Sequence, residues 1–232
     1  VNFDINKHDK FKKNFLRKVE TKNIYSFLAR KISEGSILAI CSGNAEFGPR
    51  ALGARSIIAN PLKNNIVEIL NTKIKLREPF RPFAPICLEE HVNKFFNLNT
   101  ESNFMLFICE TLEKMKEKIP GVVHKDGTAR VQSVGKENEI IYKILNEFYN
   151  ITNIPVLINT SFNIGGEAIV NSYDDAINSF LQMDIDYLLL GNDIFEKNLN
   201  EEKNYIKPSL DEFIKRRTNT FNKINQFPNY NI

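Results

Sequence analysis

The sequence is poor in the residues that build metal centres and disulfide frameworks. Its 232 residues include three cysteines, three histidines and no tryptophan. The cysteines are far apart and odd in number, which indicates buried free thiols in a reducing compartment. His8, His91 and His124 show neither metal-ligand spacing nor a nucleophile partner. We therefore expect no metal site within this chain.

Long apolar runs and strong net charge are also lacking. No run approaches the roughly 20 apolar residues that cross a bilayer, and the lysine-rich start lacks the apolar stretch of a secretion signal. We therefore expect a cytoplasmic protein without a membrane partner. The 31 basic and 28 acidic residues give a charge of +3, which is too balanced to indicate a nucleic-acid partner.

Glycine-rich phosphate loops are missing as well. The chain contains neither G-x-x-x-x-G-K-S/T nor G-x-G-x-x-G. A bound nucleotide would therefore be held by arginine and lysine side chains.

The apolar spacing predicts helices and strands that mingle without strict βαβ alternation, which favours a mixed α/β (α+β) sheet. Helices are expected over 1–34, 62–72, 89–96 and 137–149, with another opening at Ser172. Strands are expected over 36–41, 56–59, 83–88, 104–109, 128–134, 155–158 and 187–190. The run 104–109 is apolar on both faces and is expected to be a central strand. The polar sequence after about residue 200 is expected to be peripheral.

One turn-like segment carries two arginines. Arg50 and Arg55 lie in Glu46-Phe-Gly-Pro-Arg-Ala-Leu-Gly-Ala-Arg-Ser56. Glycine and proline disfavour helix and strand interiors. A rigid turn that presents guanidinium groups is suited to binding a phosphate or carboxylate.

A second basic segment lies in Lys73-Ile-Lys-Leu-Arg-Glu-Pro-Phe-Arg-Pro82. Its two prolines favour an extended chain. Period-two alternation then places Lys73, Lys75, Arg77 and Arg81 on one face, with apolar residues behind them. The alternative is a solvated, charged strand edge.

Two further segments add polar groups. Arg130 lies in Asp126-Gly-Thr-Ala-Arg-Val-Gln132 and is uninformative alone. Asn159, Ser161 and Asn163 follow an apolar strand, where ligands collect in open sheets. Their amides and hydroxyls suit phosphate oxygens, a ribose or a small amide. An ordinary Asx or Ser/Thr turn is the alternative.

Four segments, taken in order, resemble the C-terminal domain of the O-carbamoyltransferase family found in nodulation-factor and antibiotic biosynthesis. They are Glu46-Phe-Gly-Pro-Arg-Ala-Leu-Gly-Ala-Arg-Ser-Ile57, Lys75-Leu-Arg-Glu-Pro-Phe-Arg-Pro-Phe-Ala-Pro85, Asp126-Gly-Thr-Ala-Arg-Val-Gln132 and Pro155-Val-Leu-Ile-Asn-Thr-Ser-Phe-Asn163. The resemblance covers residues 30–197 and implies a YrdC-like fold, a twisted mixed sheet flanked by helices. We expect a helical lead-in over 1–35, the domain itself over 36–200, and a tail over 201–232.

The resemblance also implies a reaction. Family members use ATP and carbamoyl phosphate to form carbamoyl-adenylate, then pass the carbamoyl group to a hydroxyl of an acceptor, commonly a sugar. By matching positions, Arg50, Lys75, Arg81 and Arg130 would hold phosphates, with Ser161 and Asn163 completing the pocket and Arg55 and Arg77 as second members. Lys75, Arg81 and Arg130 are the expected catalytic residues, Asn159 is a further expected substrate ligand, and Mg²⁺ is expected with ATP.

Family members carry a long N-terminal domain in which histidine and aspartate hold a metal for the transfer step. Nothing in this chain matches that domain, so we expect it as a partner, in cis or as a separate chain. Two alternatives remain: a non-catalytic remnant or nucleotide-binding module, and a tRNA-modifying relative of threonylcarbamoyl-adenylate synthase. The Glu46-Phe-Gly-Pro-Arg50 segment favours the carbamoyltransferases.

Overall fold

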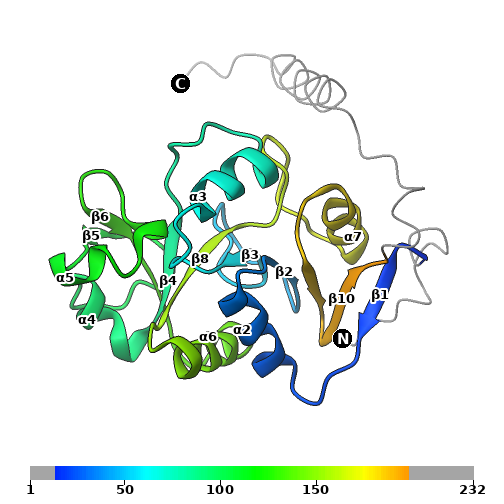
Figure 1. The fold of residues 1–232 in the computed structure, drawn as a ribbon, viewed down its shortest axis with the longest axis horizontal. Helices are drawn as coiled ribbons and strands as arrows, with labels where there is room; N and C mark the ends of the chain where they lie inside the picture. Colours follow the sequence, from blue (N-terminus) through cyan, green and yellow to red (C-terminus); the bar gives the residue numbers. More distant parts are fainter. Residues whose placement is uncertain (1–13, 199–232) are drawn as a thin grey trace.

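A mixed eight-stranded sheet forms the body of the computed structural model, which describes residues 14–198 (Figure 1). The strand order is β1-β10-β9-β2-β3-β8-β4-β7. The β2–β9 and β4–β7 pairs are parallel and the other pairs are antiparallel. The strands are β1 (Leu16–Val19), β2 (Leu38–Cys41), β3 (Arg55–Ala59), β4 (Ala84–Leu88), β7 (Gln132–Val134), β8 (Val156–Ser161), β9 (Tyr187–Leu190) and β10 (Asp193–Lys197).

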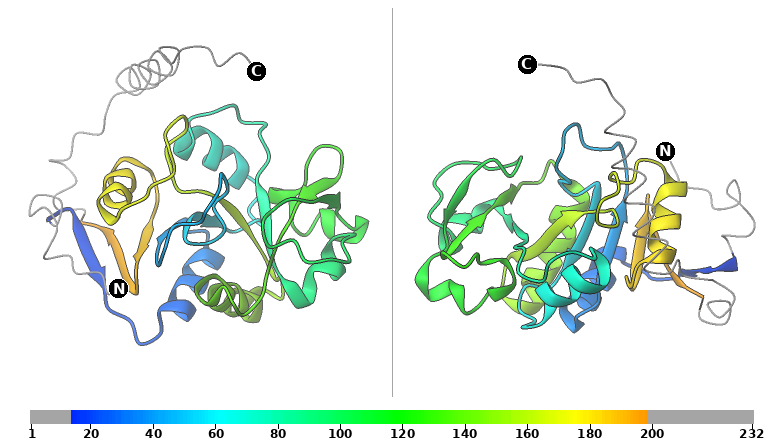
Figure 2. Two further views of the ribbon diagram at one scale, coloured as in Figure 1. Left: turned by 180° about the vertical axis from the view of Figure 1, so that it is seen from behind. Right: turned by 90° about the horizontal axis from the view of Figure 1, so that it is seen from above.

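Helices cover both faces of this sheet (Figures 1 and 2). The helices α2 (Ile24–Glu34) and α6 (Glu139–Thr152) pack on one face and α3 (Ile66–Ile69) and α7 (Tyr173–Gln182) on the other. The short helices α4 (Val92–Phe95) and α5 (Glu113–Lys116) lie at one end of the molecule (Figure 1). Shorter turns are a π-helical turn η2 (Leu70–Ile74) and the 3-10 turns η3 (Glu89–His91) and η4 (Pro120–Val122). A separate two-stranded ribbon pairs β5 (Ile108–Glu110) with β6 (Thr128–Arg130).

The alternation of side chains along β2 explains its continuous apolar sequence. Leu38 and Ile40 pack in the core cluster that includes α2 and α6, whereas Ala39 and Cys41 pack in the opposite cluster with α7. A strand covered on both faces buries every residue, so it reads as an unbroken apolar run. The prediction of a mixed α/β sheet flanked by helices is thereby confirmed.

The helix termini follow the expected capping chemistry. Gly35 ends α2 with φ 111°, a left-handed conformation that glycine adopts without a steric penalty. Ser172 opens α7 in a capping box with Asp175. No helix of the described part is long and apolar enough to cross a membrane.

The N-terminal helix prediction is wrong over residues 16–19. These residues form β1, which pairs antiparallel with β10, a strand that the sequence analysis missed. Pairing with a distant edge strand overrides the local helical spacing. Residues 1–13 of the predicted helix and the expected tail over 201–232 lie outside the described residues.

The predicted central strand over 104–109 is also wrong. Only the end of this run forms a strand, β5, and β5 pairs with the ribbon partner β6 and not with the main sheet. Phe104, Leu106 and Ile108 are 62%, 74% and 64% exposed. The chain leaves the main sheet here, so an apolar run that resembles a buried strand lies on the surface instead.

Candidate anion-binding site

The carboxylate of Glu46 holds the backbone of the arginine-bearing segment in place. Oε1 of Glu46 accepts hydrogen bonds from the backbone N–H groups of Leu52 and Ala54 at 2.7 Å and of Arg55 at 3.1 Å. Three charge-assisted bonds hold a loop that has no regular secondary structure. The sequence analysis quoted Glu46 but did not assign it this role. The sequence does contain a signal for this role, because an acidic residue precedes a glycine-containing turn whose backbone N–H groups need acceptors.

The two arginines of this segment have different environments. Arg55 is 5% exposed and donates five hydrogen bonds to the carbonyl oxygens of Ser42, Gly43, Ala54 and Asn171. A guanidinium has five N–H donors, so main-chain carbonyls occupy all of them. The structure thus shows that Arg55 holds the loop through all of its N–H donors, while its predicted role in binding substrate stays a prediction. Arg50 is exposed and has no hydrogen-bond partner within residues 14–198.

The predicted basic face over residues 73–81 does not form. Helical structure continues through η2 to Ile74, and Leu76 then adopts φ 47°. The result is that Lys73 is exposed while Lys75 is buried at 3% exposure. Period-two alternation fails because the segment is a π-helical turn followed by a left-handed residue.

Asn71 organises the loop that follows. Its side-chain Nδ2 donates to the carbonyl oxygens of Pro79 at 3.0 Å and Arg81 at 2.9 Å. Its Oδ1 accepts a hydrogen bond of 2.6 Å from Nε of Arg77, whose guanidinium lies 4.7 Å from the ring centre of Phe83. Asn71 therefore fixes the position of Arg77, a role that the sequence did not indicate.

Lys75 lies beneath the end of β8. Its Nζ donates to Oδ1 of Asn163 at 2.9 Å, to the Asn163 carbonyl at 3.1 Å, to Oγ of Ser161 at 3.3 Å, and to the Ser161 carbonyl. Burial, and then the charge of Arg77, lowers the pKa of Lys75 to about 7, while these acceptors favour its protonated form.

Gly165 makes the close packing around Lys75 feasible. A Cβ at this position would lie 1.9 Å from the carbonyl oxygen of Lys75. Only glycine allows the two backbones to approach this closely.

Cationic side chains from three segments meet at one small pocket. It measures about 130 Å³, and its lining includes Arg50, Arg77, Arg130, Asn159 and Ser161 but no acidic residue. Burial, and then the charge of Arg50, lowers the pKa of Arg130. Burial, and then the charge of Arg81, lowers the pKa of Arg77. Positive charges that crowd a partly buried site favour an anion as the ligand.

The other predicted site residues lie around this pocket. Asn163 and Lys75 support the end of β8. Arg81 does not line the pocket, because its side chain is 52% exposed and lies 3.7 Å from the carboxylate of Glu78. The structure therefore places Arg81 at the surface beside the site.

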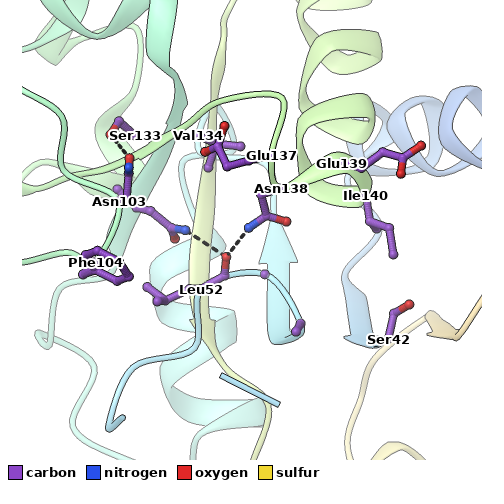
Figure 3. A pocket seen from close by; sticks show the side chains of 13 residues that line it. Ser42, Leu52, Asn103, Phe104, Ser133, Val134, Glu137, Asn138, Glu139 and Ile140 are labelled. Atoms are coloured by element: carbon purple, nitrogen blue, oxygen red, sulfur yellow. Dashed lines mark hydrogen bonds between the residues drawn. The ribbon is translucent and has the colours of Figure 1, made fainter. Parts of the chain in front are cut away.

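A second pocket of about 470 Å³ is lined in part by residues 52–54 of the arginine-bearing loop (Figure 3). Its lining includes Leu52, Asn103, Phe104, Glu137 and Glu139, but no arginine or lysine. Figure 3 shows Asn138 donating to the Leu52 carbonyl oxygen, which also accepts a hydrogen bond from Nε2 of Gln132. Although this pocket is larger, its carboxylates make it unsuited to an anion.

No group of three or more histidine, cysteine, aspartate or glutamate side chains suited to a metal ion occurs within residues 14–198. Cys41, Cys87 and Cys109 are free thiols in this structure.

Sequence comparison places these features in a family context. Residues 29–197 match the family model described as "Carbamoyltransferase C-terminus". The chain is 38% identical over 192 residues to nodulation protein NolNO of Sinorhizobium fredii, covering 81% of this chain and 28% of that protein. It is 40% identical over 173 residues to NolO of Bradyrhizobium diazoefficiens, covering 73% and 32%. It is 42% identical over 140 residues to nodulation protein U of Rhizobium tropici, covering 60% and 24%. The chain thus spans about a third or less of these relatives.

A solved structure shares the fold. Full-length HypF, crystallised in a phosphate- and nucleotide-bound form, matches with a TM-score of 0.51 at 17% identity, covering 79% of this chain and 22% of HypF. This likeness supports the expected YrdC-like fold.

Proposed function

The chain belongs to the carbamoyltransferase C-terminal family, and we propose that it forms carbamoyl-adenylate from ATP and carbamoyl phosphate for transfer to a hydroxyl of a sugar-type acceptor. The observation that carries this proposal is the pocket at which Arg50, Arg77 and Arg130 converge and whose lining contains no acidic residue. Two anionic substrates repel each other, and converging cations offset that repulsion. The phosphate- and nucleotide-bound form of HypF supports the same ligand class.

The lining arginines have the most direct roles in this proposal. The side chains of Arg50 and Arg130 have no hydrogen-bond partner within residues 14–198, so their guanidinium groups are available to phosphate oxygens. Arg77, held by Asn71, contributes a third charge. In this reaction water first cleaves carbamoyl phosphate to carbamate and inorganic phosphate, and a carbamate oxygen then attacks the α-phosphate of ATP with pyrophosphate as the leaving group. The three arginine charges would stabilise the negative charge that develops at the α-phosphate in the second step.

Lys75 and Asn163 lie behind the residues that line the pocket. The Lys75 ammonium holds Ser161 and Asn163 in place, and Ser161 lines the pocket. Lys75 is thus a positioning residue in this proposal, because its contacts are to protein oxygens. We propose that Lys75 fixes the position of the end of β8 next to the bound anion.

The size of the pocket limits what it holds. A volume of about 130 Å³ corresponds to roughly four water molecules in the liquid, so the pocket suits one small anion or a single phosphate group of a nucleotide. We assign carbamoyl phosphate, or one phosphate of ATP, to this pocket. Magnesium would arrive with ATP, since Mg²⁺ commonly binds through substrate phosphates and water.

The exposed apolar side chains support a protein partner. Five large apolar side chains near the pocket are exposed: Phe47 and Phe80 lie on the segments that carry Arg50 and Arg77, and Phe104, Leu106 and Phe107 flank the lining residue Met105. Exposed apolar surface next to a site is typical of an interaction face. We propose that an N-terminal carbamoyltransferase domain, in cis or as a separate chain, covers this face. That domain would supply the acceptor site and its metal.

Pyrophosphate release from ATP by the purified chain tests the proposed reaction. We expect release that depends on carbamoyl phosphate and falls at least tenfold in Arg130→Ala. Arg17→Ala is the control, because Arg17 lies at the far edge of the sheet and pairs with Glu196. Binding of both substrates without release, in the chain and in its complex with an N-terminal domain, would instead identify a nucleotide-binding module.

A further inference from the structure

One buried acceptor in the pocket lacks a partner. Asn159 lies on β8, is 2% exposed and lines the cationic pocket. Its side-chain Nδ2 donates to the carbonyl oxygen of Ala51 at 3.1 Å and to Oε1 of Gln132 at 2.7 Å. Its Oδ1 is buried and accepts no hydrogen bond within the described residues. Buried polar atoms are nearly always paired, so this one indicates a ligand group.

The surrounding network fixes which end of the amide is the oxygen. The Gln132 side chain donates through Nε2 to the Leu52 carbonyl at 2.8 Å, so its Oε1 must face Asn159. That oxygen and the Ala51 carbonyl are both acceptors, and only the NH₂ group of Asn159 can donate to both. If Oδ1 and Nδ2 of Asn159 exchanged places, Oδ1 would face the Ala51 carbonyl oxygen and Gln132 Oε1, and neither of these oxygens can donate a hydrogen bond. The unpaired atom is therefore an acceptor that needs a donor.

The lining of the pocket narrows the chemistry of that donor. Arg50, Arg77 and Arg130 require negative charge on the ligand, whereas Oδ1 of Asn159 requires an N–H or O–H group. A small ligand that satisfies both carries an anionic group and a neutral donor within a few bonds of each other. Carbamoyl phosphate has this pattern, because its phosphate is joined through one oxygen to a carbonyl carbon that bears NH₂.

We propose that Oδ1 of Asn159 accepts a hydrogen bond from the carbamoyl NH₂ and thereby selects carbamoyl phosphate over acyl phosphates that lack it. This inference rests on the proposed function. Acetyl phosphate has almost the same shape but carries a methyl group where carbamoyl phosphate carries NH₂. Binding it would leave the Asn159 oxygen unpaired and buried, which lowers affinity.

Access to the oxygen requires a small adjustment of the pocket wall. Oδ1 has almost no solvent-accessible surface, so a ligand reaches it only when neighbouring side chains move by about the width of an atom. The Arg50 side chain is exposed and unpaired within residues 14–198, which makes it the part of the wall that moves most easily. Gln132 and the Ala51 carbonyl, which hold the amide, are buried and stay in place.

The test compares the two acyl phosphates, freshly dissolved, by isothermal titration calorimetry. We expect the unmodified chain to bind carbamoyl phosphate at least tenfold more tightly than acetyl phosphate. Asn159→Leu should reduce this preference to less than twofold. Gln132→Met, which removes the group that orients the Asn159 amide, should reduce it partly. Asn103→Leu, the same kind of change in the second pocket, should retain it.

The outcomes distinguish a failure of the role inferred for Asn159 from a failure of the proposed function. Equal affinity of the unmodified chain for both compounds, lost in Arg130→Ala, would overturn the role of Asn159 and leave the anion site intact. The same follows if Asn159→Leu folds and retains the preference. If neither compound binds, the proposed function fails and the inference fails with it. Because the preference is a ratio within one protein, a general loss of stability does not imitate the expected result.

Discussion

The basic residues of this site fall into two groups that occupy different layers of the molecule. The lining cations, Arg50, Arg77 and Arg130, surround the small pocket. The supporting cations, Arg55 and Lys75, lie beneath it and donate to protein oxygens. Each supporting cation shares a sequence segment with a lining cation: Arg55 with Arg50, and Lys75 with Arg77. The local supply of main-chain carbonyls, and not the residue type, decides whether a cation is available to a ligand.

Substitution of Arg55 should have the largest effect and should act on stability. Arg55→Met leaves the buried carbonyl oxygens of Ser42 and Asn171 without their donor. We expect the free energy of unfolding to fall by about 3 kcal/mol, measured by urea denaturation. Arg17→Ala, which removes an exposed ion pair with Glu196, should cost less than about 1 kcal/mol. Equal losses in the two variants would contradict the distinction between the layers.

Substitution of a lining cation should act on binding instead. Arg130→Ala removes a guanidinium that has no hydrogen-bond partner within residues 14–198. We expect affinity for carbamoyl phosphate to fall tenfold to about a hundredfold, as for loss of a charged hydrogen bond, with the urea midpoint nearly unchanged. Calorimetry and denaturation of the same sample measure both. A large loss of stability with unchanged affinity would place Arg130 among the supporting cations.

Gly165→Ala should disturb the supporting layer without removing a charge. The added Cβ would lie 1.9 Å from the Lys75 carbonyl oxygen, so one backbone must move. We expect a loss of about 2 kcal/mol, in the range for overpacked sites, again by urea denaturation. Gly43→Ala is a control for backbone strain alone, because a Cβ there meets nothing within 4 Å but the φ of 62° disfavours alanine. Unchanged stability of Gly165→Ala would contradict the close approach of the two backbones.

The titration of Lys75 should make stability depend on pH. Its pKa is about 7 in the folded protein and 10.5 in the unfolded chain. Between these values the unfolded state binds the extra proton, so stability rises with pH, by up to about 1 kcal/mol per pH unit. Urea denaturation from pH 7.5 to 9.5 measures this slope, and Lys75→Met should remove it. Identical slopes in both proteins would mean that Lys75 stays protonated when folded.

Arg81→Ala should have the smallest effect. Its side chain is 52% exposed and lies near Glu78 outside the pocket lining. We expect less than a threefold change in carbamoyl phosphate affinity and less than about 0.5 kcal/mol in stability. A tenfold loss of affinity would return Arg81 to the binding residues, as the family resemblance implied.

The sequence alone predicted much of the sheet but less of the site. The buried strands β2, β4 and β9 were recognisable because strands covered on both faces are uniformly apolar. The same rule failed at Phe104 and Leu106, which have a buried strand's composition but lie on the surface. Burial depends on where the chain runs after leaving the sheet, which a local pattern does not contain.

Within the site, the sequence predicted which segments meet but not how each side chain is used. Arg50 and Arg55 have similar neighbours in sequence, and only the folded loop shows that four carbonyls surround one of them. Gln132 was not assigned a role, because its function depends on Leu52 and Asn159, which are far away in sequence. Hydrogen bonds between residues far apart in the chain produce no periodic pattern in the sequence.

A crystal structure of the chain soaked with pyrophosphate would test most directly whether the lining cations form the anion site. The account predicts a phosphate group in the small pocket, within hydrogen-bond distance of Arg50 and Arg130. Pyrophosphate bound in the larger pocket beside Glu137, or anywhere away from these two arginines, would contradict it.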